Sequence, residues 1–546
     1  MSRGVTYGCR FIALVVLFSG SAMLAADAAA LSGLIDAQVQ AAWEREKISP
    51  APMSGDAEFL RRVHLDLIGV IPTYDEAVAF LADASPDKRS KLIDRLLDDP
   101  RYAQHQADVW DLLLFGRNPP NNDADKREGF QNWLREQFQA NAPYDQIVRQ
   151  ILRAEGNTVE QGPPMYLVQY RNRPEDATEA ITQTFLGVQL QCARCHDHPF
   201  EAWKQLDFYG MAAFLARLDV VTVGKKDQLS ILAIGEKNSG DILFTGPASQ
   251  QEPGKKGSPV PAKFLLGDVL QEPPLPEGFK EVKFEQNKAP PPPQFSRKDQ
   301  LADWIARPEN PYFARAVANR VWAQFMGRGV AHPVDNLSDS NKPSHPELLD
   351  GLALAMTEQG FDLKAYIRAL CNSRTYQLSS AGDVADAMPR WFQQARSRPL
   401  SVEELTESWR VATGYDVVEQ SSAQKQKSTS RFRPLEGGYV LRFFGQPNNG
   451  VGDFQGGLQE HLYLNNGPMG SLIATGKGSL FDALTTSSDP WPERIDRMYL
   501  SLLTRPATDD EKQKFVEFLT IEGKPQDRLR DAIWVLMTCS EFRFNH

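Results

Sequence analysis

Residues 57–69, AEFLRRVHLDLIG, carry apolar side chains at helical spacing. Leu60, Val63 and Leu67 recur three or four residues apart, the interval that places side chains on one face of an α-helix. His64 falls on this apolar face, where a hydrogen-bonded core histidine is its expected role. This stretch therefore predicts an amphipathic helix packed inside a helical domain.

The chain continues beyond this stretch as helix, short turn, helix. Thr73 and Glu76 form the signature of a capping box for a helix that runs to about Ala82. Ser85-Pro86 is a typical start for the next helix, which extends up to Pro100.

Three more helices are expected at 101–115, 125–140 and 143–154, with the polar loop PPNND at 119–123 between the first two. Trp110 and Trp133 are predicted to pack in the core.

Helical periodicity stops at about residue 219 and resumes at 296. Between these points glycine, lysine and proline are frequent, with β-like pieces such as DILFTG (241–246) and AKFLLGDV (262–269). The run APPPP at 289–293 is typical of an extended polyproline linker. We therefore predict a mainly α protein with two helical domains, joined by a Pro/Gly-rich, partly β insert.

The expected domain order follows from these boundaries. It comprises a signal peptide at 1–26, a helical domain at 31–218, the insert at 219–295 and a second helical domain at 296–546.

The second helical domain contains a capping-box signature and two similar stretches of sequence. Thr508 and Glu511 form another capping-box signature. The stretches at 366–377 and 532–545 each read as an apolar helix that ends in cysteine, serine and an aromatic residue, which suggests a weak internal duplication.

The first thirty residues predict export. Arg3 and Arg10 precede a short apolar run, and small residues follow it, so cleavage is expected between Ala26 and Ala30. No later stretch reaches the length of a membrane-spanning helix. We expect an exported protein of the periplasm or cell envelope, with no membrane span after cleavage.

The chain of 546 residues has a formal net charge of −10, and its hydrophobic fraction of 42% is that of an ordinary globular protein. An acidic balance without a basic stripe argues against nucleic acid as a general partner.

Residues 185–203, FLGVQLQCARCHDHPFEAW, hold closely spaced thiols beside histidines. Cys192, Cys195 and His196 form a Cys-x-x-Cys-His pattern, the attachment signature of haem c. In that signature the two thiols bond covalently to the porphyrin and the histidine ligates iron, so the leading hypothesis is covalent haem and electron transfer.

Three other interpretations of this stretch stay open. Zinc or another metal held by the cysteines with His196 and His198 is one, although ligands this tightly packed rarely close a tetrahedron alone. A redox or structural disulfide is the second, and buried thiols without a ligand are the third. Cys371 and Cys539, far apart in sequence, are expected to be buried thiols.

A helix is expected to start at Pro174 and run toward Leu190, so that the motif lies at its C-terminal end. Aromatic residues cluster after the motif, where they could pack round a macrocycle or simply form core. They are Phe200, Trp203, Phe208, Tyr209 and Phe214.

An electron-transfer haem needs a second axial ligand, and six residues are candidates. They are His198, Met165, Met211, His332, His345 and His461. His198 is too close to His196 in sequence for both to lie on opposite faces of one haem.

Polar residues also concentrate between two amphipathic helices of the C-terminal half. They are Asn319, Arg320, Asp335, Asn336, Asp339, Asn341, His345 and Glu347. A hydrolytic or binding cleft is one interpretation, with His345 as base or ligand. The favoured one is structural: Arg320 pairs with an acid, Ser344 caps the helix near Pro346, and His345 bonds a local backbone group.

The chain resembles the planctomycete family in which a cytochrome-C-like N-terminal domain precedes a planctomycete-specific C-terminal domain, both without established biochemical function. The N-terminal residues that carry the resemblance are FLRRVHLDLIGVIPT (59–73), LIDRLLDDPRYAQ (92–104) and 185–203. The C-terminal ones are 301–330, PSHPELLD (343–350) and RTYQLSS (374–380).

The resemblance implies export in a bacterial cell and a haem-type motif, but no reaction. Relatives often carry a cysteine-rich segment after a stretch that reads LRFFGQPNN here (441–449), whereas this chain continues with GVGDFQGG (450–457). No phosphate loop, nucleophile elbow or His-Glu-x-x-His pattern is present, which weakens nucleotide, esterase and zincin hypotheses.

We therefore leave the question of an enzyme open. The leading prediction is an electron-transfer protein with an unknown redox partner. The alternative is a metal- or disulfide-stabilised scaffold without haem that binds an envelope protein or polysaccharide.

Overall fold

The computed structural model describes residues 9–116, 128–226, 229–244, 257–381, 388–415, 458–466, 473–522 and 524–546. The predicted loop at 119–123 and the segment at 441–457 lie outside these residues. For residues 9–27 and for His461 the structure describes the backbone and not the side chain. Helices make up 54% and strands 7%, which confirms the mainly helical prediction. Across the described ranges, no helix has both the length and the apolar character of a membrane span.

The chain forms two compact units, each built from separate segments. The first unit comprises residues 1–42, 107–323 and 328–370, and the second comprises 43–106, 324–327 and 371–546. The predicted domain order along the chain stays a prediction, because these units do not follow that order.

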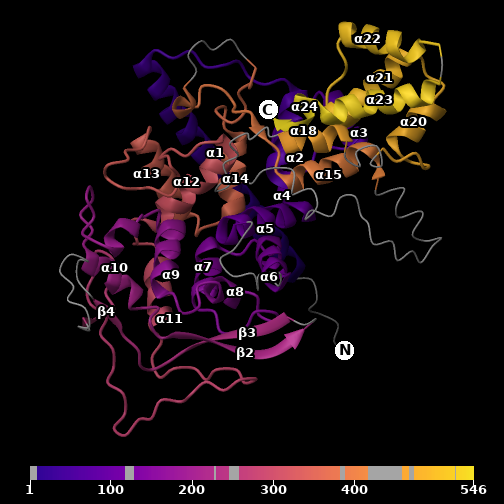
Figure 1. Cartoon of the computed structure of the whole chain (residues 1–546). Coiled ribbons are helices and arrows are strands. Elements are labelled where there is room, and N and C mark those ends of the chain that lie inside the picture. Colours follow the sequence, from indigo (N-terminus) through magenta and orange to yellow (C-terminus); the bar gives the residue numbers. More distant parts are fainter. Residues whose placement is uncertain are drawn as a thin grey trace, which may run out of the picture. The chain divides into compact units, whose positions relative to one another are not determined.

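The first unit holds two of the three sheets of the described residues, together with helices that Figure 1 labels between α6 and α13. Its helices are α6 (Glu128–Gln139), α7 (Tyr144–Leu152), α8 (Pro164–Val168), α9 (Pro174–Ile181), α10 (Gln205–Ala212), α11 (Arg297–Ile305) and α13 (Pro346–Glu358). Four more helices extend past the limits of a unit: α1 (Cys9–Glu46), α5 (Pro100–Phe115), α12 (Phe313–Met326) and α14 (Leu363–Asn372).

The predicted β insert is confirmed, and one strand from outside it joins the sheet. β2 (Leu218–Lys226) and β3 (Leu229–Glu236) form an antiparallel hairpin, and β1 (Gly156–Asn157) pairs with the other edge of β3. β4 (Ile242–Phe244) lies in the predicted piece DILFTG and pairs with β5 (Ser258–Val260).

The stretch AKFLLGDV forms no strand. It contributes an isolated bridge between Lys263 and Val269, because its backbone turns back on itself through Leu266, which has a φ of 56°.

The core of the first unit gathers apolar side chains from helices on both sides of the insert. Its fully buried members include Phe130, Val148, Tyr166, Phe185, Phe208, Phe214, Ile305, Phe313 and Trp322. Trp110 is buried as predicted, with 4% of its surface exposed. The prediction for Trp133 is wrong: this side chain is half-buried and donates from Nε1 to the side-chain oxygen of Gln150 at 3.2 Å.

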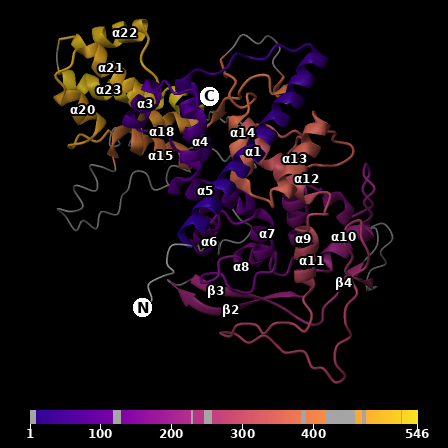
Figure 2. The ribbon, with the colours of Figure 1, turned by 180° about the vertical axis from the view of Figure 1, so that it is seen from behind.

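The second unit is a set of helices with one two-stranded sheet. Its elements are α2 (Asp56–Ile68), α3 (Tyr74–Ala82), α4 (Lys88–Leu97), η5 (Pro389–Trp391), β6 (Arg398–Pro399), α15 (Val402–Thr413), α18 (Leu458–Asn466), α20 (Leu480–Thr486), α21 (Trp491–Leu503), α22 (Asp509–Thr520), α23 (Pro525–Thr538), α24 (Ser540–Arg543) and β7 (Phe544–Asn545). Both ribbon views show α21, α22 and α23 side by side (Figure 2).

Local sequence signals set several helix ends in this unit. Both predicted capping boxes form, at Thr73 with Glu76 and at Thr508 with Glu511. The predicted start of α4 at Ser85-Pro86 is wrong by two to three residues, because Asp87 is the N-cap and the helix begins at Lys88.

The two similar tails are each bound by an arginine of α2. Arg61 donates from Nη2 to the carbonyl of Phe542 at 2.8 Å. Arg62 donates from Nη1 to the carbonyls of Tyr376 and Leu378, both at 2.8 Å. Adjacent arginines on one helix thus bind the backbone that follows each tail's cysteine.

His64 is a core histidine, as the sequence predicts. Its ring is fully buried, and its Nδ1 donates to the carbonyl of Leu60 at 2.9 Å. Burial lowers the pKa of His64 from 6.5 to about 4, with Glu76 opposing this shift and Arg101 adding to it.

We expect His64 to make the second unit sensitive to acid. The folded pKa lies below the unfolded one, so this stability is complete above pH 6.5 and is lost as the pH falls from 6.5 to 4. The loss amounts to about 3 kcal/mol. Urea unfolding at pH 7 and pH 4.5 should show a smaller acid-induced drop for His64→Gln than for the wild type. An equal drop in both proteins would contradict the assignment.

Candidate functional site

The helix that precedes the motif ends earlier than predicted. α9 begins with Pro174 and passes into a π-helical turn, η2 (Thr182–Leu186), which Gly187 terminates with a φ of 65°. The predicted continuation to Leu190 is therefore wrong, because a left-handed residue stops a helix. π-helical turns of this kind are frequent beside functional sites.

Cys192 lies on a separate 3₁₀ turn, η3 (Gln191–Arg194), and Cys195 is the C-cap residue that ends this turn. Ala193, between them, is fully buried, whereas both thiols are exposed and free. The turn is closed by the amide of Cys195, which donates to the carbonyl of Cys192 at 3.3 Å. The two sulfur atoms are thus accessible, while the buried side chain of Ala193 packs this stretch of backbone against the unit.

His196 follows this turn and is exposed. Its Nδ1 lies 2.7 Å from the carbonyl oxygen of Asp197. Because a carbonyl oxygen only accepts, this hydrogen bond places the proton on Nδ1 and leaves the lone pair on Nε2. That tautomer is the one in which an imidazole ligates a metal through Nε2.

His198 has a different role from His196. Its Nδ1 accepts hydrogen bonds from the amides of Glu201 at 3.0 Å and Phe200 at 3.3 Å. Its own amide donates to the carbonyl of Trp203 at 2.8 Å. His198 therefore closes the loop after the motif, and Nε2 is the ring atom left for other contacts.

Side chains from α9 and α10 fix the backbone of the motif. Arg194 forms ion pairs with Asp176 at 2.9 Å and Glu179 at 3.1 Å. Partial burial opposes the charge of Arg194, but these two carboxylates outweigh it and raise the pKa of Arg194. The side-chain Nε2 of Gln205 donates to the carbonyl of Arg194, and the backbone amide of Gln205 donates to Oδ1 of Asp197.

The predicted aromatic cluster is divided between core and surface. Phe208 and Phe214 are fully buried, whereas Phe200 has 82% of its surface exposed. Trp203 is half-buried and lies edge-on to Tyr312, with ring centroids 6.4 Å apart. Phe200 is thus an exposed aromatic ring beside the two histidines.

The residues of the motif fit covalent haem attachment: two accessible thiols three residues apart are followed by an exposed imidazole whose hydrogen bond to a carbonyl is made by Nδ1. Across the described part of the chain, no three His, Cys, Asp or Glu side chains converge as a metal site would require. Zinc and disulfide interpretations of Cys192, Cys195, His196 and His198 stay hypotheses.

The candidate axial ligands occupy different environments. Met165 and Met211 are buried in the first unit, with 4% and 1% of their surfaces exposed. His345 is buried at the start of α13, and its Nδ1 lies 2.9 Å from the hydroxyl of Ser344. His332 is half-buried.

The polar residues at 319–347 are structural contacts, as the favoured interpretation holds. Asn319 binds the carbonyls of Ala331 and Val334 from Nδ2 at 2.8 and 3.1 Å, and Arg320 pairs with Asp335. One detail is wrong: His345 is the N-cap of α13, and Ser344 donates instead to the carbonyl of Val330 at 3.1 Å.

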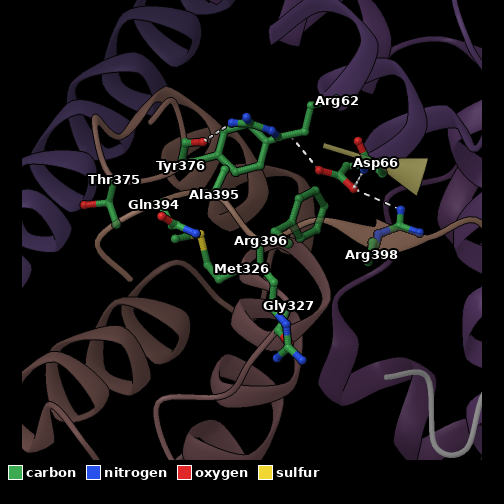
Figure 3. Close-up of a pocket in the computed structure, with 12 residues that line it drawn as sticks. Arg62, Asp66, Met326, Gly327, Thr375, Tyr376, Gln394, Ala395, Arg396 and Arg398 are labelled. Carbon is green, nitrogen blue, oxygen red and sulfur yellow. Dashed lines mark hydrogen bonds and ion pairs between the residues drawn. The ribbon is translucent and has the colours of Figure 1, made fainter. Parts of the chain in front are cut away.

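A buried charge network that sequence reasoning missed lies in the second unit, centred on Asp66 (Figure 3). Asp66 accepts hydrogen bonds from the hydroxyl of Tyr376 at 2.8 Å, from Arg398 at 3.0 Å and from Nδ2 of Asn545 at 2.7 Å. Arg398 also binds both carboxylate oxygens of Glu404, at 2.7 and 2.8 Å. The only sequence signal was a set of charged residues inside the apolar pattern of α2.

The environment of Asp66 opposes its charge. Burial raises the pKa of Asp66, and Arg398 and Tyr376 offset this only in part. Burial also acts on Glu404, but the guanidinium of Arg398 prevails and lowers the pKa of that carboxyl. Arg398 is therefore shared between two acids, of which Glu404 holds it more strongly.

A small cavity adjoins this network. Its volume is about 20 Å³, the space of one water molecule, and its walls include Arg62, Asp66, Tyr376 and Arg398 (Figure 3). The network is thus packed around a space too small for a substrate, which favours a structural role.

We expect Asp66→Asn to destabilise the second unit by about 3 kcal/mol, because three donors would then face an uncharged amide in a buried site. Denaturant unfolding measures this loss. The matched control is Asp87→Asn, whose partner Lys91 is exposed, and its cost should stay below about 1 kcal/mol. An equal loss of unfolding free energy in the two variants would show that the buried contacts of Asp66 do not stabilise the unit.

Comparison with protein-family models gives two matches. Residues 34–220 match PSCyt2, described as a protein of unknown function (DUF1549). Residues 297–443 match PSD1, also described as a protein of unknown function (DUF1553). Comparisons with curated proteins and with solved structures gave no match. The chain therefore belongs to the family that joins a planctomycete-type, cytochrome-like domain to a planctomycete-specific domain, both of unknown function.

Proposed function

We propose that this chain is an exported electron-transfer protein of the c-type cytochrome kind. Cys192 and Cys195 are the covalent anchors of haem c in this proposal, and His196 is the proximal ligand. The observation that carries it is the pair of exposed, free thiols, one on a 3₁₀ turn and one at its C-cap, directly followed by an imidazole with Nδ1 bound to a carbonyl.

Covalent attachment of haem requires that both cysteine thiols be accessible. Cys192 and Cys195 would each hold the haem through a thioether: the thiol would add across one vinyl group, with the sulfur bonding to one vinyl carbon and the hydrogen passing to the other. No oxidant or reductant is consumed. Once bound, the haem would supply one-electron redox chemistry. Because both thiols are exposed, this addition does not require the core of the unit to open.

The surroundings of the motif suit a docking electron carrier. His196 and Phe200 are exposed on the same loop, so a redox partner could approach closely. The partner in this proposal is a protein of the periplasm or cell envelope, since haem c is attached outside the cytoplasm. Export rests on the Arg3 to Ala30 pattern of the sequence.

The first test is a pyridine haemochrome spectrum of the protein produced in a host with c-type maturation. We expect a c-type band that survives denaturation, because thioether bonds are covalent. The control is Cys192→Ala/Cys195→Ala, which should lack the band. A colourless wild-type protein would refute the proposal, and metal and disulfide analysis of that sample would then separate a zinc site from a disulfide.

A second candidate function, polysaccharide binding, is favoured by a pocket in the second unit. The pocket has a volume of about 500 Å³, which suits a sugar ring or two. Trp491 forms part of its wall, with the guanidinium of Arg494 4.8 Å from the ring centroid. Lys524 and Gln526 add exposed polar groups, so the pocket combines an aromatic surface with hydrogen-bond donors.

The charged residues that line this pocket are two cations, Arg494 and Lys524, and one acid, Asp527. The excess of positive charge favours a polysaccharide that carries carboxylates. With polygalacturonate as the probe in isothermal titration, Lys524→Glu should weaken binding by about fivefold, because it reverses an attractive charge. Lys514→Glu, on exposed α22, is the matched control. No binding by the wild type, or an equal loss in the control, would count against this candidate.

A further inference from the structure

Three contacts join the motif region to a short segment that is distant in sequence but belongs to the same compact unit. We call residues 187–201 the Cys-His loop and residues 335–340 the clasp segment. The loop lies in the part of the chain that matches PSCyt2, and the clasp segment lies in the part that matches PSD1.

The first contact is at Gly187, where the Cys-His loop begins. The amide of Leu337 donates to the carbonyl of Gly187 at 2.8 Å. The side chain of Leu337 also covers this glycine: a Cβ at position 187 would lie 2.9 Å from Cγ of Leu337. With a φ of 65° as well, position 187 admits only glycine without strain.

The second contact is at Glu201, where the loop ends. The hydroxyl of Ser340 donates to Oε1 of Glu201 at 2.5 Å, and this hydrogen bond is the main reason that the pKa of Glu201 is lowered. The amide of Glu201 in turn donates to Nδ1 of His198 at 3.0 Å. Ser340 is therefore connected through Glu201 to a histidine of the loop.

The third contact supports both elements. Arg320, on α12, donates from Nη2 to the carbonyl of Thr184 in the π-helical turn at 3.1 Å, and it also pairs with Asp335 at the start of the clasp segment. Arg320 and Asp335 are largely buried, with 11% and 16% of their side chains exposed. A part-buried ion pair thus holds the turn before the loop and the clasp segment together.

We infer that the clasp segment positions the Cys-His loop, with Leu337 and Ser340 as the positioning residues. The two ends of the loop bind the same short segment, so the C-terminal family region adds to the contacts from α9 and α10 that set where Cys192, Cys195 and His196 lie in the unit. The two family regions then build one site together. As far as haem is concerned, this inference rests on the proposed function.

The first experiment needs no haem. In the full chain produced without haem maturation, iodoacetamide labelling of Cys192 and Cys195 is followed by peptide mass spectrometry, with the half-buried Cys539 as internal reference. The variant is Leu337→Ala/Ser340→Ala, and Lys342→Ala, an exposed neighbour outside the clasp segment, is the matched control.

We expect the labelling rates of Cys192 and Cys195, relative to that of Cys539, to change at least about threefold in the double variant and to stay within error in the control. Ser340→Ala alone should give a smaller change in the same direction. Since Ser340 is exposed, this single variant keeps the test valid if the double variant does not fold. Unchanged rates in a folded double variant would overturn the inference.

A second readout uses the haem-loaded protein. The reduction potential of the double variant should shift from that of the wild type, because the orientation of His196 changes with the loop. If the wild type binds no haem, the proposed function fails while the labelling result still decides the inference. If haem binds and neither labelling nor potential responds to the variant, the inference fails and the proposed function stands.

Discussion

The carboxylate of Asp66 has almost no contact with solvent, and much of the second unit is arranged to bind it. A buried charge without partners costs several kcal/mol, so the chain has to supply donors from elsewhere. Tyr376, Arg398 and Asn545 do so from three stretches that are far apart in sequence. Because all three must meet at α2, the position of this helix constrains the turn at 373–380, the start of α15 and the sheet of β6 with β7.

The adjacent arginines of α2 extend the same constraint. Arg61 and Arg62 bind backbone carbonyls that follow the cysteine of each of the two similar tails, at Phe542 and at Tyr376. Such carbonyls lack partners at the ends of helices, and a buried guanidinium can bind several of them at once. The family resemblance at 59–73 and 374–380 therefore coincides with a structural core.

The Cys-His loop follows a different principle. Its reactive groups are exposed, whereas the residues that hold it in place make close contacts with the rest of the unit: Ala193 is buried beneath the turn, Arg194 is ion-paired with two acids, and Leu337 is half-buried and packs against Gly187. An exposed site on a fixed backbone suits a group that must be reached by a cofactor or a protein partner. The family match adds a cytochrome-like name to this loop but no reaction, so the chemical argument rests on the residues themselves.

Sequence alone determined the features that depend on neighbours along the chain. The mainly helical class, the apolar face of α2, both capping boxes and the Cys-x-x-Cys-His pattern follow from local spacing, because helix periodicity and capping involve residues three or four apart. The predictions that proved wrong, such as the helix to Leu190 and the core position of Trp133, depended on contacts or on a left-handed backbone that spacing does not encode.

Only the tertiary structure decided how distant residues meet. It brought Asp66 to Arg398, and it placed Leu337 and Ser340 against the two ends of the Cys-His loop. These pairings join residues more than a hundred positions apart, and nothing in the local pattern of either partner specifies the other. The reason is physical: burial and charge compensation depend on which residues surround a side chain in the folded protein, whereas periodicity depends only on the order of residues along the chain.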